Sequence, residues 1–456
     1  MRNLSRRSVL KFGAAGAGTL MLPVAPPAAA ESNQDPHFFL LIVLDGGADS
    51  SYMFDARPLS MTRAGRIQNY LGQEPMPWIG SNGVAARATS LARPLFRYRD
   101  DFSVLNGVCM TPSFDGHLQN MNFLLTGNPF GGSSFVPQLN AAETGRQPGL
   151  LDAVLPGSPL FANLDNHSRV VPLQAMAVAG LSARLKQMAP LRQGDELADF
   201  LDSRLAANAA EPGRFASAAG TMREAMRGTR EMHRRLAQLV PPRFDLPPEE
   251  QAVSLISQCF RLSIARSAIY VASELFDVHA PEQAINQPKL FASAVDKILT
   301  LLDGLCETPF DAKKSMFEVT TVMIATEMGR TFRASGLPVH FTGTNHNQFS
   351  NSFLLGGKGI RGGLVIGASD SADERELVSK AHLSLDPFLE KAIGRPFDFA
   401  TLKPRPDLPD AFDIQDYLTV GSVVNTLYAL FGVPAAHYRS LRRDLPVAPV
   451  LKGLLV

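Results

Sequence analysis

The sequence has 456 residues, of which 45% are hydrophobic and 19% are charged, as in ordinary globular proteins. A chain of this length can bury one large core or two, and no segment after residue 30 has the roughly 20 unbroken apolar residues of a membrane helix. The three cysteines, Cys109, Cys259 and Cys306, lack the spacing of a zinc motif, so we interpret them as buried small side chains, with one disulfide as the alternative.

Residues 1–30 have the features of an export signal. Ser5-Arg-Arg-Ser-Val-Leu-Lys-Phe12 resembles the twin-arginine motif, an apolar Gly/Ala-rich stretch follows it, and Ala28-Ala-Ala30 offers small residues to a signal peptidase. We therefore expect the twin-arginine export machinery to deliver the protein to the periplasm or the medium. Removing this segment takes four of the 44 basic residues and none of the 43 acidic ones, which leaves a formal net charge of −3. This balance gives no electrostatic reason to expect nucleic-acid binding.

The first expected strand covers residues 38–44, an apolar run that stops at Asp45-Gly-Gly-Ala-Asp49. Glycines allow the backbone to turn sharply after a strand. We interpret Asp45 and Asp49 as candidate metal ligands at the carboxyl edge of a sheet, with capping of the following turn as the alternative.

A second core strand is expected over residues 102–106, followed by a turn and a helical pattern that ends at Gly127. Thr111, Ser113, Asp115 and His117 crowd this turn. A helix N-terminus favours anions and helps to ionise a nucleophile, but Ser113 or Asp115 would serve equally well as a simple N-cap. His117 lies in the first turn of the expected helix, beside a glycine.

The middle of the chain predicts loops over residues 128–168, a strand within 169–178 and helices over 193–239. Glu211-Pro-Gly213 interrupts the helical pattern, so we expect a helical hairpin, an insertion over about residues 193–240 on one side of the core, with its charges on a solvated face. A helix over 249–267 then leads to a third apolar strand, 268–275.

The third strand ends at Phe276-Asp-Val-His279. In an extended Asp-X-His segment the two side chains point to the same side, so Asp277 and His279 can converge on one ion, although a capping pair is the commoner use. A helix over 287–305 returns the chain to the main sheet.

The fourth strand, residues 318–326, is apolar and β-branched, and a carboxylate follows it in Glu327-Met-Gly-Arg-Thr331. A polar loop with Thr344-Asn-His-Asn-Gln348, an apolar run over 353–355 and a glycine-rich turn come next. Because ligands gather at the carboxyl edge of open α/β sheets, this region predicts a metal-dependent, hydrolase-like site. The remaining chain is polar and proline-rich over 368–412 and predicts an amphipathic helix over 413–431, with Gly432 as its cap.

Taken in order, these motifs resemble those of the domain of unknown function 1501 family, exported proteins placed in the alkaline-phosphatase and sulfatase superfamily. The segments that carry the resemblance are Asp45 to Pro58, His117 before its helix, Phe276-Asp-Val-His279, Thr326-Glu-Met-Gly-Arg-Thr331, Thr344-Asn-His346, Phe353 to Gly367 and the helix after Asp413. The resemblance implies an α/β fold with a mostly parallel central sheet and helices on both faces, over residues 31–456.

Active members of that superfamily use two metal ions, often zinc, or one calcium, and attack a phosphate or sulfate ester with a Ser, Thr or formylglycine nucleophile. Carried over to this chain, the resemblance implies Asp45, Asp277, His279, Glu327 and His346 as ligands, with Asp49 and His117 as further candidates. Such ligands suit zinc, with manganese, iron or calcium as alternatives. Arg330 would bind an ester's oxyanions or pair with Glu327.

Two departures leave a second interpretation open. The family's serine before the first histidine is Gly116 here, so Thr111 or Ser113 would have to be the nucleophile, and the family's aspartate before the second histidine is Asn345. The chain is therefore expected to be either a hydrolase of small-molecule or glycan esters or a catalytically inactive periplasmic binding or assembly protein on the same fold.

Overall fold

The structure is a computed structural model. It describes residues 36–60, 71–110, 116–130, 132, 134–141, 153–155, 170–172, 193–210, 216–272, 276–331, 333–334, 344–371, 389–390, 392–406, 413–440 and 445–456. The expected export signal, Thr111, Ser113 and most of the segment 169–178 lie outside the described residues.

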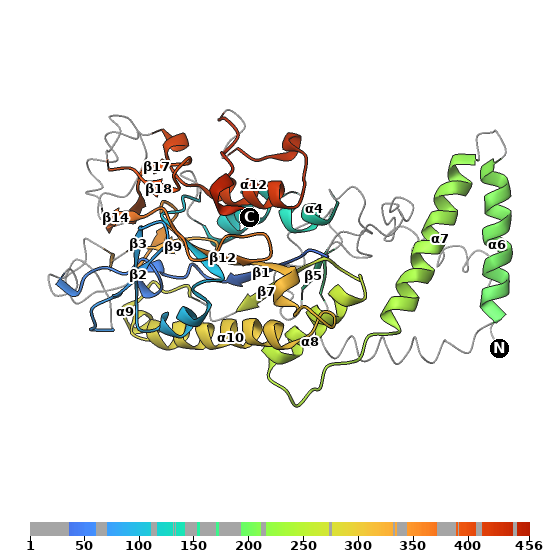
Figure 1. Ribbon diagram of the computed structural model, residues 1–456, viewed down its shortest axis with the longest axis horizontal. Coiled ribbons are helices and arrows are strands. Elements are labelled where there is room, and N and C mark those ends of the chain that lie inside the picture. The colour runs from blue at the N-terminus through green and yellow to red at the C-terminus, as the bar shows by residue number, and fades with distance from the viewer. Residues whose placement is uncertain are drawn as a thin grey trace, which may run out of the picture.

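The centre of the molecule is an eight-stranded sheet in the order β13-β4-β12-β8-β1-β7-β5-β6 (Figure 1). Only β12 is antiparallel to its neighbours β4 and β8, and the other pairings in the sheet are parallel. The expectation of a mostly parallel sheet is therefore confirmed. The strands are β1 (Phe38–Leu44), β4 (Phe102–Asn106), β5 (Ala153–Leu155), β6 (Val170–Pro172), β7 (Ser267–Ala272), β8 (Thr320–Thr326), β12 (Ser352–Gly357) and β13 (Val365–Ile366).

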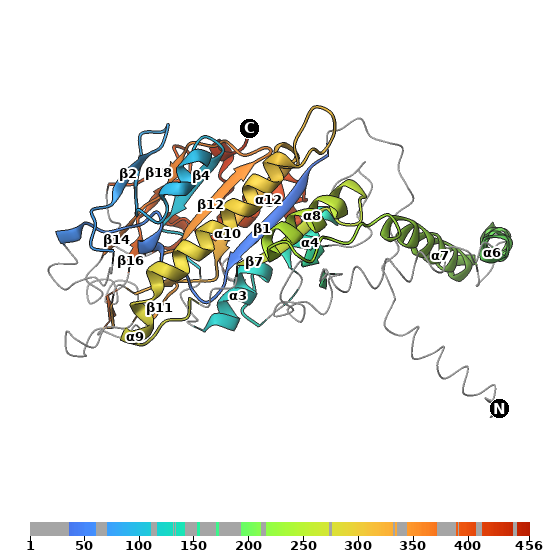
Figure 2. The same cartoon turned by 90° about the horizontal axis from the view of Figure 1, so that it is seen from below.

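Helices cover both faces of this sheet (Figures 1 and 2). Phe38, Leu40 and Ile42 of β1 join the apolar cluster of α8 and α10. The alternate residues Phe39 and Leu41 join the cluster of α3, α4 and α12, because successive side chains of a strand point to opposite faces. Burial on both faces explains why β1, β7 and β8 are apolar without alternation. The helices are α3 (His117–Thr126), α4 (Phe135–Ala141), α8 (Pro248–Arg261), α10 (Gln287–Glu307) and α12 (Val420–Leu430).

Two further helices, α6 (Gln193–Ala210) and α7 (Ala216–Leu236), confirm the expected helical hairpin. Both views show the pair projecting from one end of the molecule, away from the sheet (Figures 1 and 2). Of the helices that the structure describes, none combines the length and the apolar character needed to cross a bilayer.

The smaller elements are short strand pairs and one short helix. They are β2 (Met76–Ile79) with β3 (Ala85–Ala88), β9 (Gly329–Arg330) with β11 (His346–Asn347), β10 (Arg333–Ala334) with β15 (Leu389–Glu390), β14 (Ser369–Ser371) with β16 (Ala392–Gly394), β17 (Phe397–Asp398) with β18 (Lys403–Pro404), and α9 (Pro281–Ala284). The only tryptophan, Trp78 in β2, is buried between Phe54 and Phe96.

Three expectations about local structure were wrong. The last helix begins at Val420 rather than Asp413, because the Thr419 side chain caps it by accepting from Ser422 N–H. It is not amphipathic, since residues 420–428 are all buried. The segment expected to be loops, residues 128–168, contains α4 and β5, and the polar, proline-rich segment after residue 368 contains β14 to β18. One further expectation was wrong, because Cys306 is exposed rather than buried. Cys109 and Cys259 are buried as expected, and all three cysteines are free thiols.

Candidate metal centre

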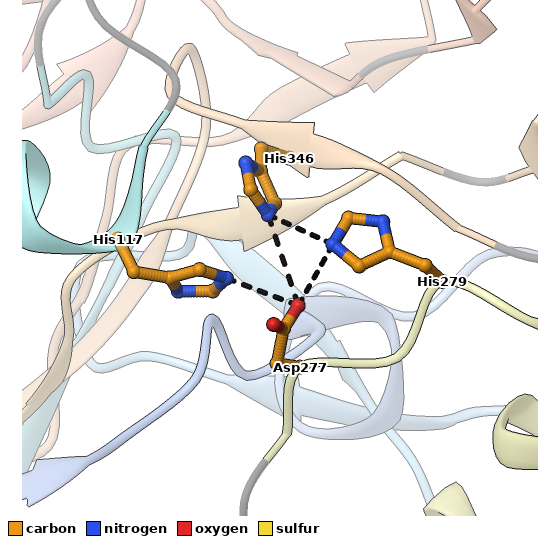
Figure 3. Close-up of side chains that lie close together, drawn as sticks. All are labelled: His117, Asp277, His279 and His346. Atoms are coloured by element: carbon orange, nitrogen blue, oxygen red, sulfur yellow. Dashed lines mark hydrogen bonds and ion pairs between the residues drawn. The ribbon is translucent and has the colours of Figure 1, made fainter.

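Four side chains converge in the structure: His117, Asp277, His279 and His346 (Figure 3). One ligand atom from each lies within 4.8 Å of the other three. The Asp277 Oδ1 atom lies 3.0 Å from His117 Nε2, 2.8 Å from His279 Nε2 and 3.8 Å from His346 Nε2. The Nε2 atoms of His279 and His346 are 3.1 Å apart.

The parallel pairing of the central strands explains why these residues meet. Leu44, Ala272 and Thr326 are register partners at the ends of β1, β7 and β8, so the segments that follow these strands leave the sheet at the same edge. Asp277 and His279 follow β7 and point to the same side, as the Asp-X-His pattern predicted. His117 begins α3, and His346 in β11 pairs with Arg330 in β9.

The turn after β1 requires glycine. Gly46 has a φ of +98°, and a Cβ atom there would lie 2.7 Å from the backbone nitrogens of Phe276 and Asp277. The Phe276 N–H donates to the Asp45 carbonyl at 3.1 Å. The bare backbone of the turn thus allows the segment that carries Asp277 to pack directly against the end of β1.

The spacing of the four ligand atoms fits a single ion. Tetrahedral zinc with bonds of about 2.0–2.1 Å separates its ligand atoms by roughly 3.4 Å. Four of the six separations run from 2.8 to 3.8 Å, and all six lie within 4.8 Å. Three imidazoles and one carboxylate are also a donor set that zinc and other first-row divalent metals accept. Asp277 and His279, with side chains 44% and 46% exposed, leave the centre open to solvent.

Glu327 lies behind His117 and is not one of the four converging groups. Its Oε1 atom accepts from the Gly46 N–H at 2.9 Å and lies 2.7 Å from His117 Nδ1. An ionised carboxylate can only accept, so His117 carries a proton on Nδ1 and turns Nε2 toward Asp277. His117 Nε2 is buried and has no hydrogen-bond partner among the described residues. With a charged imidazole, the 3.0 Å separation of Nε2 and Asp277 Oδ1 is a favourable ion pair, and a metal ion bound by both atoms would replace the proton on Nε2.

Arg330 is fully enclosed and holds this edge of the sheet together. Its guanidinium donates to Asp277 Oδ1 at 2.6 Å and to the backbone carbonyls of Gly46, Gly47, Phe276 and Val278 at 2.8 to 3.5 Å. The side chain is 0% exposed and does not pair with Glu327. We therefore assign Arg330 the role of fixing Asp277, whereas the sequence had left open a contact with an ester or a pairing with Glu327.

The remaining expected ligands lie outside the four converging groups. Asp49 is buried, and its Oδ1 accepts from the Ser51 N–H at 2.9 Å at the start of a 3-10 turn, which is the capping role left open by the sequence. Asp45 is half-buried at the end of β1. Asn345 uses its side-chain oxygen to accept from the His346 N–H at 2.8 Å. Gly116 is the residue before α3 and gives that helix no side-chain cap.

The charges around the centre shift several pKa values. Burial favours the neutral Asp277 carboxyl, but the hydrogen bond from Arg330 and the nearby His117 hold the pKa of Asp277 well below its usual range. Burial opposes the charging of His117, yet the carboxylates of Glu327 and Asp277 outweigh it and raise the pKa of His117. Burial, and then the neighbouring Glu327 carboxylate, raises the pKa of Asp45. The centre is thus rich in negative charge and lone pairs.

The fold and this centre together define a mixed α/β protein with a candidate metal-binding cluster of three histidines and one aspartate. A comparison with protein families matches residues 153–384, just over half of the chain, to the family described as "Protein of unknown function (DUF1501)". The chain belongs to this family. The matched region contains Asp277, His279 and His346, whereas His117 precedes it. No curated protein matches the chain.

Proposed function

We propose that His117, Asp277, His279 and His346 bind one divalent metal ion, with zinc as the best fit, and that the protein is a metal-dependent hydrolase of phosphate or sulfate esters. The convergence of their four ligand atoms within 4.8 Å carries the metal-binding part of this proposal. The contact of Glu327 with His117 Nδ1, which leaves the buried Nε2 atom directed at Asp277, supports it independently.

Hydrolysis is the chemistry that suits an open centre of this kind. A divalent ion held by these residues would polarise an ester oxygen and would lower the pKa of a water molecule enough to supply a nucleophile at neutral pH. The residues of the chain would hold the ion, fix the tautomer of His117 through Glu327 and fix Asp277 through Arg330. Exposed edges of His279 and Asp277 would admit a small-molecule or glycan ester.

We also propose where the protein is located and to which superfamily it is related. Ser5-Arg-Arg-Ser-Val-Leu-Lys-Phe12 and the apolar stretch after it support twin-arginine export to the periplasm or the medium. The doubly covered, mostly parallel sheet, with its ligands at the carboxyl edge, supports a relationship to the alkaline-phosphatase and sulfatase superfamily.

Metal content and ester hydrolysis, measured on the same preparations, test the proposal. Metal-free protein is incubated with zinc, manganese or calcium, freed of unbound metal and analysed for its elements. We expect one ion per chain in the wild type, loss of binding in His346→Ala, and wild-type binding in His437→Ala, which removes an exposed histidine outside the cluster. Absence of stoichiometric binding for all three metals would refute the metal site, and metal-loaded protein that cleaves neither aryl phosphate nor aryl sulfate would refute the hydrolase.

A non-catalytic binding or assembly protein is the second candidate. Gly116 stands where a nucleophile is expected, and Asn345 is engaged by the backbone of His346 instead of the centre. Metal that binds at one ion per chain without any ester cleavage would favour this candidate.

A further inference from the structure

The helical hairpin of α6 and α7 has almost no core of its own. Among its described side chains from Asp199 to Arg234, only Ala219, at 8% exposed, is buried. The two helices meet through ion pairs instead: Asp202 accepts from Arg223 and Arg227, and Asp199 accepts from Arg230. Such partly exposed pairs contribute only about 0–1 kcal/mol each, so they are a weak substitute for apolar packing.

The hairpin also exposes large apolar side chains. Phe200 is 57% exposed, Leu201 39% and Met222 58%. At about 100° per residue, Phe200 lies roughly opposite Asp202 and Leu201 lies to one side of it, so both apolar side chains are off the face of α6 that meets α7. The two helices, of 18 and 21 residues, project from the molecule (Figure 1) and have little apolar packing between them. Because most helices in proteins are stabilised by packing of an apolar face, we expect this pair to pack on another surface.

The charges of the hairpin are self-complementary. α6 has four acidic residues and one arginine, whereas α7 has five arginines and two glutamates. Asp199 remains 75% exposed, and the α7 arginines Arg227 and Arg234 remain 58% and 66% exposed. Two hairpins related by a two-fold axis can place α6 of each copy against α7 of the other, with opposite charges facing each other at both contacts.

We propose that the hairpin is a dimerisation element that pairs with the hairpin of a second copy of this chain in a four-helix arrangement. Helices of 18 and 21 residues are about 27 and 32 Å long and about 10 Å wide, so one face of the pair covers on the order of 600 Å². Two such faces bury about 1,200 Å², which reaches the lower end of stable protein interfaces. The interface is independent of the metal centre at the carboxyl edge of the sheet.

Sedimentation velocity on the exported chain tests this pairing over about 1 to 100 µM, a range that covers dimers of modest affinity. We expect a reversible dimer in the wild type. The double variant Phe200→Glu, Leu201→Glu is expected to weaken it at least tenfold. Ile79→Glu, a matched change at an apolar side chain that is 51% exposed on β2, is expected to leave it unchanged. Thermal unfolding and metal content of each variant show whether the rest of the protein is intact.

Hydrogen exchange gives a second readout that does not need a variant. Amides of residues 193–236 are expected to exchange more slowly at about 100 µM than at about 1 µM, because a dimer with a dissociation constant of about 10 µM is mostly formed at the higher concentration and mostly dissociated at the lower. The pairing is refuted if the wild type remains monomeric throughout, or if the double variant dimerises like the wild type. Dimerisation without added protection of the hairpin refutes it as well.

Discussion

Glu327 provides the sharpest test of how the centre is built, because the sequence suggested a metal ligand and the structure places it behind His117. Its Oε1 atom lies 2.7 Å from His117 Nδ1, and the side chain is 0% exposed. Carboxylates in this position set the tautomer and basicity of a ligating histidine, and their removal costs about 10- to 100-fold in metal affinity. We therefore expect Glu327→Ala to weaken zinc binding by that factor, or about 1.4–2.7 kcal/mol.

The matched variant Glu327→Gln separates geometry from charge. Its side-chain oxygen can still accept from His117 and from the Gly46 N–H, so we expect a loss of affinity between that of the wild type and that of Glu327→Ala. Competition with a coloured chelator measures the affinities, and the absorption spectrum of cobalt-loaded protein reports whether the ligand set is unchanged. Glu327→Ala also leaves a buried N–H unsatisfied at about 1–3 kcal/mol, so unfolding curves must show that each variant is folded.

Two results would refute this reasoning. If Glu327→Ala binds zinc as tightly as the wild type, the carboxylate does not control His117. If it binds as weakly as His346→Ala and changes the cobalt spectrum, Glu327 is itself a ligand, as the family resemblance implied.

Three further predictions concern other parts of the molecule. Arg330→Lys leaves several of the four buried carbonyls without a donor, at a cost of about 1–3 kcal/mol each. The free energy of unfolding, measured in urea, should therefore fall by several kcal/mol. An unchanged unfolding midpoint would contradict the role assigned to Arg330. A thiol reagent should modify only Cys306 in the folded protein, because Cys109 and Cys259 are buried and burial raises the pKa of both to about 12; mass spectrometry would show one adduct per chain, rising to three on unfolding. Burial raises the pKa of Asp49 from 3.8 to about 6, so the folded state holds this proton more tightly than the unfolded state does. The wild type should therefore lose stability relative to Asp49→Asn as the pH rises from about 4 to 6. If the unfolding free energies of the two proteins depend on pH in the same way, this prediction is wrong.

Local patterns in the sequence predict the structure correctly where a single physical cause determines it. Residues 38–44 and 102–106 are strands as expected, because apolar residues without helical periodicity suit a strand buried on both faces. The Asp277-Val-His279 pair converges as its spacing predicted. The predicted start of the last helix was wrong because the Thr419 side chain caps the helix at that point. Its predicted amphipathic character was wrong because the fold covers α12 on both sides.

The sequence by itself determined the long strands at the centre of the sheet, the helical hairpin and the set of residues able to bind a metal, since each follows from composition and spacing within a short segment. Only the tertiary structure decided which of those residues meet. The parallel register of β1, β7 and β8 brings their ends to one edge of the sheet. At this edge His117 meets Asp277, His279 and His346, although His117 and His346 are 229 positions apart in the chain. The tertiary structure also decided that Glu327 and Arg330 lie behind these groups. Their positions depend on which buried groups they hydrogen-bond, and the spacing of residues along the chain does not encode those partners.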